Sequence, residues 1–196
     1  IVMKKILTLL ILVIFSFVFL VSCGEVSVPS ENEVSDFYEE TTNMLFRYYY
    51  AGVAAAAKTD IEDLEVYENQ FVYSDTNVPY YKTNYTYQQA LDKYSEYFTG
   101  QLLDDFMTSY FYDYDGTFCV FFSGGASGSA VDDVVATLKS QDGNIYNYDV
   151  VYAFYHGTAT EPSQEEATFS LEINSDGYRL LDTEVAYPMS DYTDFE

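Results

Sequence analysis

Positive charge is scarce in this chain of 196 residues. Only 8 residues are lysine or arginine, against 32 aspartates and glutamates, and the formal net charge is −24 at pH 7. Nucleic-acid affinity depends on lysine and arginine side chains that neutralise phosphates. The composition therefore argues strongly against nucleic-acid binding and disfavours anionic partners, whereas a basic protein, a cation or simple solubility remains compatible with it.

Side chains that commonly perform catalysis are also few, with 2 cysteines and 1 histidine. His156 is that single histidine, which excludes schemes that need two, and its place after a β-prone stretch favours a surface residue at a strand end. Cys119 lies in an apolar run, where a small buried hydrophobic residue is expected. A Cys119–His156 catalytic pair stays open as the minor alternative, although neither residue lies in a known signature. We therefore predict a protein that is not an enzyme and needs no cofactor.

The N-terminal segment has the pattern of an export signal. Lys4 and Lys5 precede an apolar stretch over residues 6–20, and small residues follow it. This order is typical of a cleavable secretory signal, whereas a transmembrane helix needs about 20 apolar residues. The sequence Leu20-Val21-Ser22-Cys23 resembles the lipobox of bacterial lipoproteins. The resemblance implies that Cys23 carries lipid, becomes the new N-terminus and anchors the protein on the extracytoplasmic face of the cell membrane.

The predicted organisation has four parts. Residues 1–22 are a lipoprotein signal peptide, 23–32 a lipidated tether, 33–190 a single α+β domain and 191–196 an acidic C-terminal tail. With Cys23 lipidated, Cys119 has no partner for an intramolecular disulfide, so a hydrophobic core must stabilise the domain. The 22 tyrosines and 15 phenylalanines supply ample apolar area for it.

Three helices are expected in the first half of the domain. Ser30 and Glu33 have the spacing of a capping box, and apolar residues then recur every three or four positions, which predicts a helix over 33–58. Thr86 and Gln89 repeat the capping-box spacing ahead of a second amphipathic helix. Thr99 is expected to cap a short third helix. Residues 64–73 could be a strand or an irregular crossing, and residues 77–84 are expected to be a loop containing a proline.

After the third helix, the pattern changes to alternating or continuous apolar runs. Asp-Gly pairs at 115–116, 142–143 and 176–177 mark tight turns between them. Strands are expected near 109–113, 117–122, 132–140, 145–156, 166–173 and 178–186. Helices followed by hairpins predict an α+β fold, in which a long N-terminal helix and short helices pack on a curved antiparallel sheet. Its core should contain Phe37, Leu45, Phe121, Val135, Val151, Phe154, Phe169 and Leu180.

Two acidic segments are the candidate partner-binding residues. The first is Asp113, Tyr114 and Asp115, which lacks the full ligand series of a calcium loop and is explained by a hairpin turn. The second is the glycine-rich stretch containing Ser123, Gly124 and Gly125, followed by Asp132 and Asp133. This stretch lacks the lysine of a phosphate-binding loop, so it is either a flexible connection or a recognition loop. No metal site is expected.

Residues 86–186 resemble the DL-endopeptidase inhibitor family of exported proteins. The shared features are Tyr94-x-x-Tyr97-Phe98-Thr99, a helix reaching 103–107, an Asp-Gly hairpin within 114–122, the glycine-rich loop, and Asp176-Gly177-Tyr178-Arg179-Leu180 in the closing strands. The resemblance implies a cystatin-like or NTF2-like cone that occupies the cleft of NlpC/P60-type peptidoglycan hydrolases. The best-known members are released from the cell, whereas Cys23 would tether this chain. The expected partners are the membrane, through this lipid, and a basic cell-wall hydrolase; the alternative function is an NTF2-like ligand- or envelope-binding module without inhibitory activity.

Overall fold

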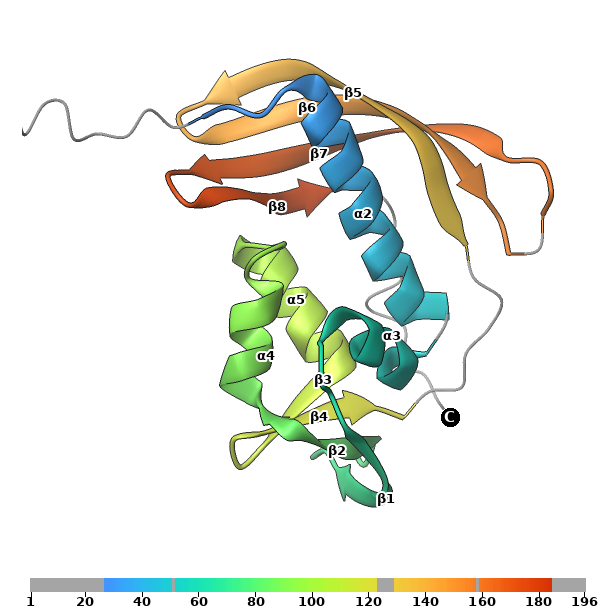
Figure 1. Ribbon diagram of the computed structural model, residues 1–196, viewed down its shortest axis with the longest axis vertical. Coiled ribbons are helices and arrows are strands. Elements are labelled where there is room, and N and C mark those ends of the chain that lie inside the picture. The colour runs from blue at the N-terminus through green and yellow to red at the C-terminus, as the bar shows by residue number, and fades with distance from the viewer. Residues whose placement is uncertain (1–26, 51, 123–128, 158, 185–196) are drawn as a thin grey trace, which may run out of the picture.

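The computed structural model describes residues 27–50, 52–122, 129–157 and 159–184 (Figure 1). Its helices are α2 (Glu31–Tyr50), α3 (Val53–Asp60), α4 (Tyr87–Tyr94) and α5 (Gly100–Tyr110). Its strands are β1 (Val66–Tyr73), β2 (Pro79–Thr86), β3 (Phe111–Tyr114), β4 (Thr117–Phe121), β5 (Ala130–Asp142), β6 (Ile145–Tyr155), β7 (Ser163–Asn174) and β8 (Gly177–Thr183). The predicted α+β class, with a long N-terminal helix and short helices on antiparallel strands, is confirmed.

The long helix α2 begins at the predicted capping box. The amide of Glu33 donates to Ser30 Oγ at 3.3 Å, and the amide of Ser30 donates to Glu33 Oε2 at 2.8 Å. The helix therefore starts two residues inside the expected tether. Gly52 has a φ of 93°, which residues with a side chain rarely adopt, and it separates α2 from α3. The prediction of one helix over 33–58 is wrong for this reason.

The next two helices differ in how they start. The amide of Gln89 donates to Thr86 Oγ1 at 3.2 Å and the amide of Thr86 donates to Gln89 Oε1 at 2.9 Å, so the second predicted capping box is confirmed. Thr99 does precede α5, but its side chain makes no capping bond. Its hydroxyl donates instead to Glu172 Oε2 at 3.0 Å, which ties the start of α5 to β7.

The sheet β5-β6-β7-β8 is built of consecutive hairpins, and α2 lies across one of its faces (Figure 1). Gly143 lies in the turn between β5 and β6 with a φ of 62°, and Gly177 opens β8 directly after the turn at Asp176 with a φ of 130°, so both Asp-Gly predictions are confirmed. Tyr38 of α2 stacks on Phe169 of β7, with their ring centroids 4.3 Å apart. This face of the sheet forms the core.

The other four strands form a second sheet, β1-β2-β4-β3, near the C-terminal end of α2 (Figure 1). The prediction of a loop over 77–84 is wrong, because these residues belong largely to β2. Pro79 opens that strand, a position where its missing amide is tolerated. Residues 66–73 are a strand, with an irregularity in its pairing between Val66 and Phe71.

Backbone hydrogen bonds join the two halves of the molecule. Phe98 forms an isolated parallel bridge with Leu180 of β8. The amide of Leu180 donates to the Tyr97 carbonyl at 2.8 Å, and the amide of Thr99 donates to the Leu180 carbonyl at 3.0 Å. The segment before α5 therefore extends one edge of the β5–β8 sheet.

A second aromatic cluster surrounds the end of α2. Tyr48 lies 5.0 Å from Phe106 and 5.6 Å from Phe111, centroid to centroid, and its hydroxyl hydrogen-bonds that of Tyr94. Because α2 also carries Tyr38, one helix contributes to the core against both sheets.

Six of the eight predicted core residues belong to the core or pack against it, whereas Val135 and Val151 lie on the outer face of the β5–β8 sheet. Leu45, Phe121, Phe169 and Leu180 are buried, and Phe37, Val151 and Phe154 are half-buried. Val135 is 61% exposed. The pairing of β5 with β6 shifts between Asp132 and Val135, and Asp133 has a φ of 51°. This bulge places Val135 opposite Val151 on the face away from α2.

The proposed lipid site Cys23 lies outside the described residues. Within the described part of the chain, no helix is both long and apolar enough to cross a membrane.

Candidate functional site

The candidate site is the face of the β5–β8 sheet that no described helix covers. Residues directly opposite each other in a sheet point to the same face. Val135 pairs with Val151, which pairs with Glu166, and Asp149 pairs with Thr168. These side chains alternate with the buried residues that face α2, so they form two rows across the outer surface.

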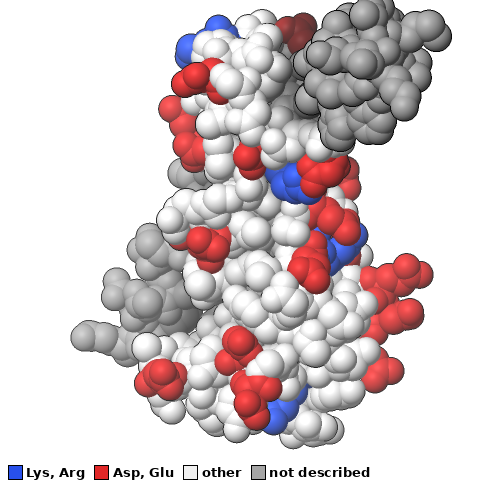
Figure 2. Space-filling view, turned by 90° about the vertical axis from the view of Figure 1, so that its left-hand side faces the viewer, with Lys and Arg blue, Asp and Glu red and all other residues white. Residues whose placement is uncertain are grey.

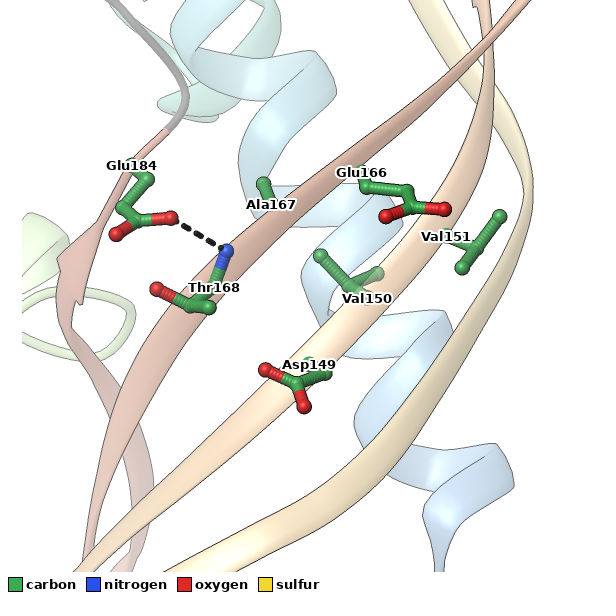
Figure 3. Close-up of a pocket in the computed structure, with 7 residues that line it drawn as sticks. All are labelled: Asp149, Val150, Val151, Glu166, Ala167, Thr168 and Glu184. Atoms are coloured by element: carbon green, nitrogen blue, oxygen red, sulfur yellow. Dashed lines mark hydrogen bonds between the residues drawn. The ribbon is translucent and has the colours of Figure 1, made fainter.

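A hollow of about 430 Å³ lies in these rows (Figure 3). It is lined by Asp149, Val150, Val151, Glu166, Ala167, Thr168 and Glu184. Figure 3 shows the carboxylates of Asp149, Glu166 and Glu184 on the near side of the strands, with α2 behind the sheet. The lining presents three carboxylates and contains neither histidine nor cysteine, so it offers negative charge rather than a strong nucleophile.

The three carboxylates have different partners. Glu184 Oε2 accepts a hydrogen bond from the Thr168 amide at 3.1 Å, and the Glu184 amide donates to the Thr168 carbonyl at 2.9 Å. Asp149 accepts a charged hydrogen bond from Lys139 Nζ at 2.8 Å. The side chain of Glu166 has neither a hydrogen bond nor an ion pair with any described residue. One carboxylate therefore remains free to receive a cation.

Among the described residues, Lys139 is the one basic side chain that forms an ion pair with a carboxylate of this hollow. Its hydrogen bond to Asp149, the negative charge of Asp149 and, to a smaller extent, that of Glu184 raise the pKa of Lys139. The lysine therefore stays protonated, and its positive charge neutralises part of the negative charge of the hollow. A single lysine against three carboxylates leaves the hollow with net negative charge.

Acidic side chains are also common elsewhere on the molecule. Figure 2 shows one side of it, where separate clusters of acidic side chains lie among uncharged residues and outnumber the few basic patches. A field of this kind favours approach of positively charged molecules. The exposed Val135 adds an apolar contact beside the carboxylates. The arrangement suits a basic side chain whose aliphatic part can lie on the valines.

The first predicted segment is the β3–β4 turn. Asp113 Oδ1 accepts a hydrogen bond from the Gly116 amide at 2.8 Å, and Asp115 has a φ of 52°. Lys82 Nζ lies 4.4 Å from the centroid of the Tyr114 ring. The hairpin explanation is confirmed, and a basic side chain already covers the tyrosine.

The second predicted segment is only partly described, because Ser123, Gly124 and Gly125 lie outside the described residues. Asp132 pairs with Ala153 and so lies on the same face as Val151. Together with burial, the charges of Asp132, Asp36 and Asp133 raise the pKa of Glu39 on α2. Asp132 and Asp133 therefore contribute to a negative field beside the candidate face.

The two predicted segments do not form one surface. Asp113 and Asp115 lie at the turn between β3 and β4 in the β1–β4 sheet, whereas Asp132 lies on β5 in the other sheet (Figure 1). The residues that the structure does bring together, Asp149, Glu166 and Glu184, were missed. For Asp149 and Glu166 the signal is the alternation of polar and apolar residues within the predicted strands 145–156 and 166–173, and Glu184 lies in the predicted strand 178–186.

The alternative Cys119–His156 catalytic pair is not formed. Cys119 is buried in β4, and burial raises the pKa of its thiol to about 11. His156 follows β6 in the other sheet, where its ring packs edge-on against Phe154 at 4.2 Å. Its Nε2 lies 3.4 Å from Ser163 Oγ. His156 is therefore not placed to act as a base for the Cys119 thiol.

A second hollow, of about 420 Å³, lies beside α3 and α4. It is lined by Ile61, Glu62, Tyr85, Gln89, Asp92, Lys93 and Glu96. Lys93 Nζ pairs with Glu96 at 2.8 Å, and the Tyr85 hydroxyl donates to the Glu62 carbonyl at 2.9 Å. Across all described residues, no group of three or more His, Cys, Asp or Glu side chains is arranged to hold a metal ion.

No protein-family model matches this chain, and no curated protein matches it either. A functional assignment therefore rests on the geometry and charge of the chain itself.

Proposed function

We propose that this chain is a non-catalytic lipoprotein, anchored by lipid on Cys23 to the extracytoplasmic face of a bacterial membrane, whose domain binds and inhibits a basic peptidoglycan DL-endopeptidase of the NlpC/P60 type. The observation that carries the proposal is the acidic outer face of the β5–β8 sheet, where the Glu166 carboxylate has no partner among the described residues and the exposed Val135 lies nearby.

Charge complementarity gives this face a physical role. Opposite charges on two proteins speed their encounter, and the gain falls as salt shortens the Debye length from about 10 Å at 0.1 M to about 3 Å at 1 M. Affinity needs closer contacts as well. Glu166 and Glu184 can accept hydrogen bonds from lysine or arginine, and Val135 and Val151 can pack against the aliphatic part of such a side chain.

The alternative, an NTF2-like ligand-binding module, has less support. A ligand in such a cone would lie between the long helix and the sheet. In this chain Tyr38, Tyr152 and Phe169 fill that space, with ring centroids 4.3 Å apart for Tyr38 and Phe169 and 6.3 Å apart for Tyr38 and Tyr152. A face that meets a protein from outside fits this packing better.

The proposal is tested by titrating the domain into peptidoglycan cleavage by NlpC/P60 endopeptidases from the same organism. Wild-type protein should inhibit at micromolar concentration. Glu166→Gln/Glu184→Gln should weaken inhibition about tenfold at low salt, because it removes the two carboxylates that a basic side chain would reach. Glutamine at 184 can still accept the hydrogen bond from Thr168, so the fold should survive.

Glu62→Gln/Asp92→Asn is the matched control, because it removes two carboxylates from the second hollow and changes the net charge equally. A direct contact predicts a clear difference between the two double variants. Lys139→Gln should strengthen inhibition, since it removes the internal competitor for Asp149, and Lys58→Gln controls for its charge. Absence of inhibition by wild type for every endopeptidase rejects the function, whereas equal weakening by both double variants rejects the site. Release of a Cys23→Ala variant from membranes tests the anchor separately.

A further inference from the structure

The strand β5 is an edge of its sheet and, with 13 residues, the longest strand described. An edge strand presents a row of backbone amides and carbonyls that can pair with a strand of another molecule. In this chain, side chains of α2 occupy several of those groups.

Asn43 and Ser35 bind two positions of the edge. Asn43 Nδ2 donates to the Val131 carbonyl at 2.9 Å, and the Val131 amide donates to Asn43 Oδ1 at 2.9 Å. This is the two-bond exchange that a residue of a neighbouring strand would make. The Ala136 amide donates to Ser35 Oγ at 2.9 Å, while the same hydroxyl donates to the Glu31 carbonyl at 2.8 Å.

A third bond continues the row. The Leu138 amide donates to Glu31 Oε1 at 3.2 Å. The bound positions thus run backward along α2, from Asn43 through Ser35 to Glu31, as they run forward along β5. The helix imitates an antiparallel partner.

The spacing of the two elements explains why a helix can do this. One step of four residues along a helix advances about 6 Å, and two residues of a strand span about 6.8 Å, so Ser35 and Glu31 match Ala136 and Leu138. From Ser35 to Asn43 the helix advances about 12 Å. Because the bulge at Asp133 takes up one residue, the strand from Val131 to Ala136 advances about 14 Å. The bulge that turns Val135 to the outer face therefore also keeps the bonding positions of the helix and the strand in register.

We propose that α2 serves as a surrogate fifth strand, which prevents β5 from pairing with the β5 edge of a second copy of this chain. The opposite edge, β8, is bonded through Leu180 to Tyr97 and Thr99. With both edges occupied in this way, partners can approach the sheet through its outer face. This inference does not depend on the proposed inhibitory function.

The proposal is tested by measuring the mass of the variant Glu31→Ala/Ser35→Ala/Asn43→Ala by sedimentation velocity over a series of protein concentrations. The exposed amides should pair between molecules, so the weight-average mass should rise with concentration and roughly double relative to wild type. Glu40→Ala, on the exposed side of α2, controls for loss of a negative charge and should behave as wild type. A triple variant that keeps its far-UV circular dichroism and the wild-type mass overturns the proposal.

A rescue variant separates edge pairing from unfolding. Leu138→Pro removes the outward amide without removing a bond to β6, which an edge strand tolerates. Added to the triple variant, it should restore the wild-type mass; association that persists or increases contradicts the proposal. Hydrogen exchange of the wild type gives an answer even where the triple variant unfolds. The amides of Val131, Ala136 and Leu138 should be protected, and exchange as fast as in unstructured chain would overturn the proposal.

Discussion

The two sheets of this molecule differ in how their strands are connected. In the β5–β8 sheet every neighbouring pair is a hairpin, and Asp-Gly turns mark two of the three connections. In the other sheet, the chain forms α4 and α5 after β2 and before β3. The next strand, β4, then pairs with both β2 and β3, which gives the order β1-β2-β4-β3. Local signals therefore describe the first sheet well, whereas the second depends on pairing between distant segments.

The sheets also differ in what their surfaces offer. The β5–β8 sheet buries one face under α2 and keeps an acidic outer face, with a hollow at Asp149, Glu166 and Glu184. The other sheet meets α5 and the end of α2 through rings such as Tyr48 and Phe111, and its buried cysteine has a raised pKa. The β5–β8 half thus carries the hollow with three carboxylates, while the other half packs its rings against the end of α2.

The largest expected effect tests whether the two halves unfold together. Phe169→Ala and Phe106→Ala each truncate a buried ring, one against each sheet. Each should lower the free energy of unfolding by about 3 to 5 kcal/mol, because a large cavity replaces the ring. Since α2 contributes to both cores, urea unfolding followed by tyrosine fluorescence and by far-UV circular dichroism should show one coincident transition for each variant.

The control for these truncations is Phe71→Ala, at a ring that is 44% exposed on β1. Its effect on the free energy of unfolding should be much smaller. Two separated transitions, with each variant moving only its own, would show that the sheets are independent units and that α2 does not couple them.

A smaller effect tests the break between α2 and α3. Gly52 has a φ of 93°, so Gly52→Ala should lower the free energy of unfolding by about 1 to 3 kcal/mol through backbone strain. A continuous helix would give the opposite sign, because alanine favours helix over glycine by about 1 kcal/mol. Gly143→Ala, in the turn between β5 and β6, is the comparison, because Gly143 also has a positive φ, 62°, and no atom lies near the added Cβ. Thermal unfolding of both variants shows whether alanine at position 52 destabilises the protein, as a break requires, or stabilises it, as a continuous helix would.

The smallest effect is pH-dependent and concerns the start of α2. Hydrogen bonds from the Ser30 amide and hydroxyl lower the pKa of Glu33. A lowered folded-state pKa stabilises the protein above the ordinary carboxyl pKa, and this contribution is lost as pH falls through the folded value. Glu33→Gln should therefore be less stable than wild type near pH 7, with the difference disappearing in acid. Denaturation midpoints from pH 7 to pH 3 measure it, and a difference that is constant across this range contradicts the capping role.

Particular residues show how far the candidate site could be predicted. The Asp115-Gly116 pair correctly predicted a hairpin, because a tight turn is specified by its own residues. It did not predict that Asp113 and Asp132 belong to different sheets, since that depends on which strands pair. The carboxylates of Asp149, Glu166 and Glu184 are separated in the sequence and meet only through the register of three strands. Val135 was assigned to the core because it lies in an apolar part of the sequence, which does not indicate the bulge that turns its side chain outward.

The sequence by itself determined what depends on short range. Capping boxes at Ser30 and Thr86, Asp-Gly turns, alternating strands and the excess of acidic residues each follow from neighbouring residues, and together they give the α+β class. The tertiary structure alone decided the split into two sheets, the strand formed by residues 79–86 and the binding of α2 side chains to the β5 edge. These features come from backbone pairing and packing between distant segments, whose energies depend on register and not on local composition.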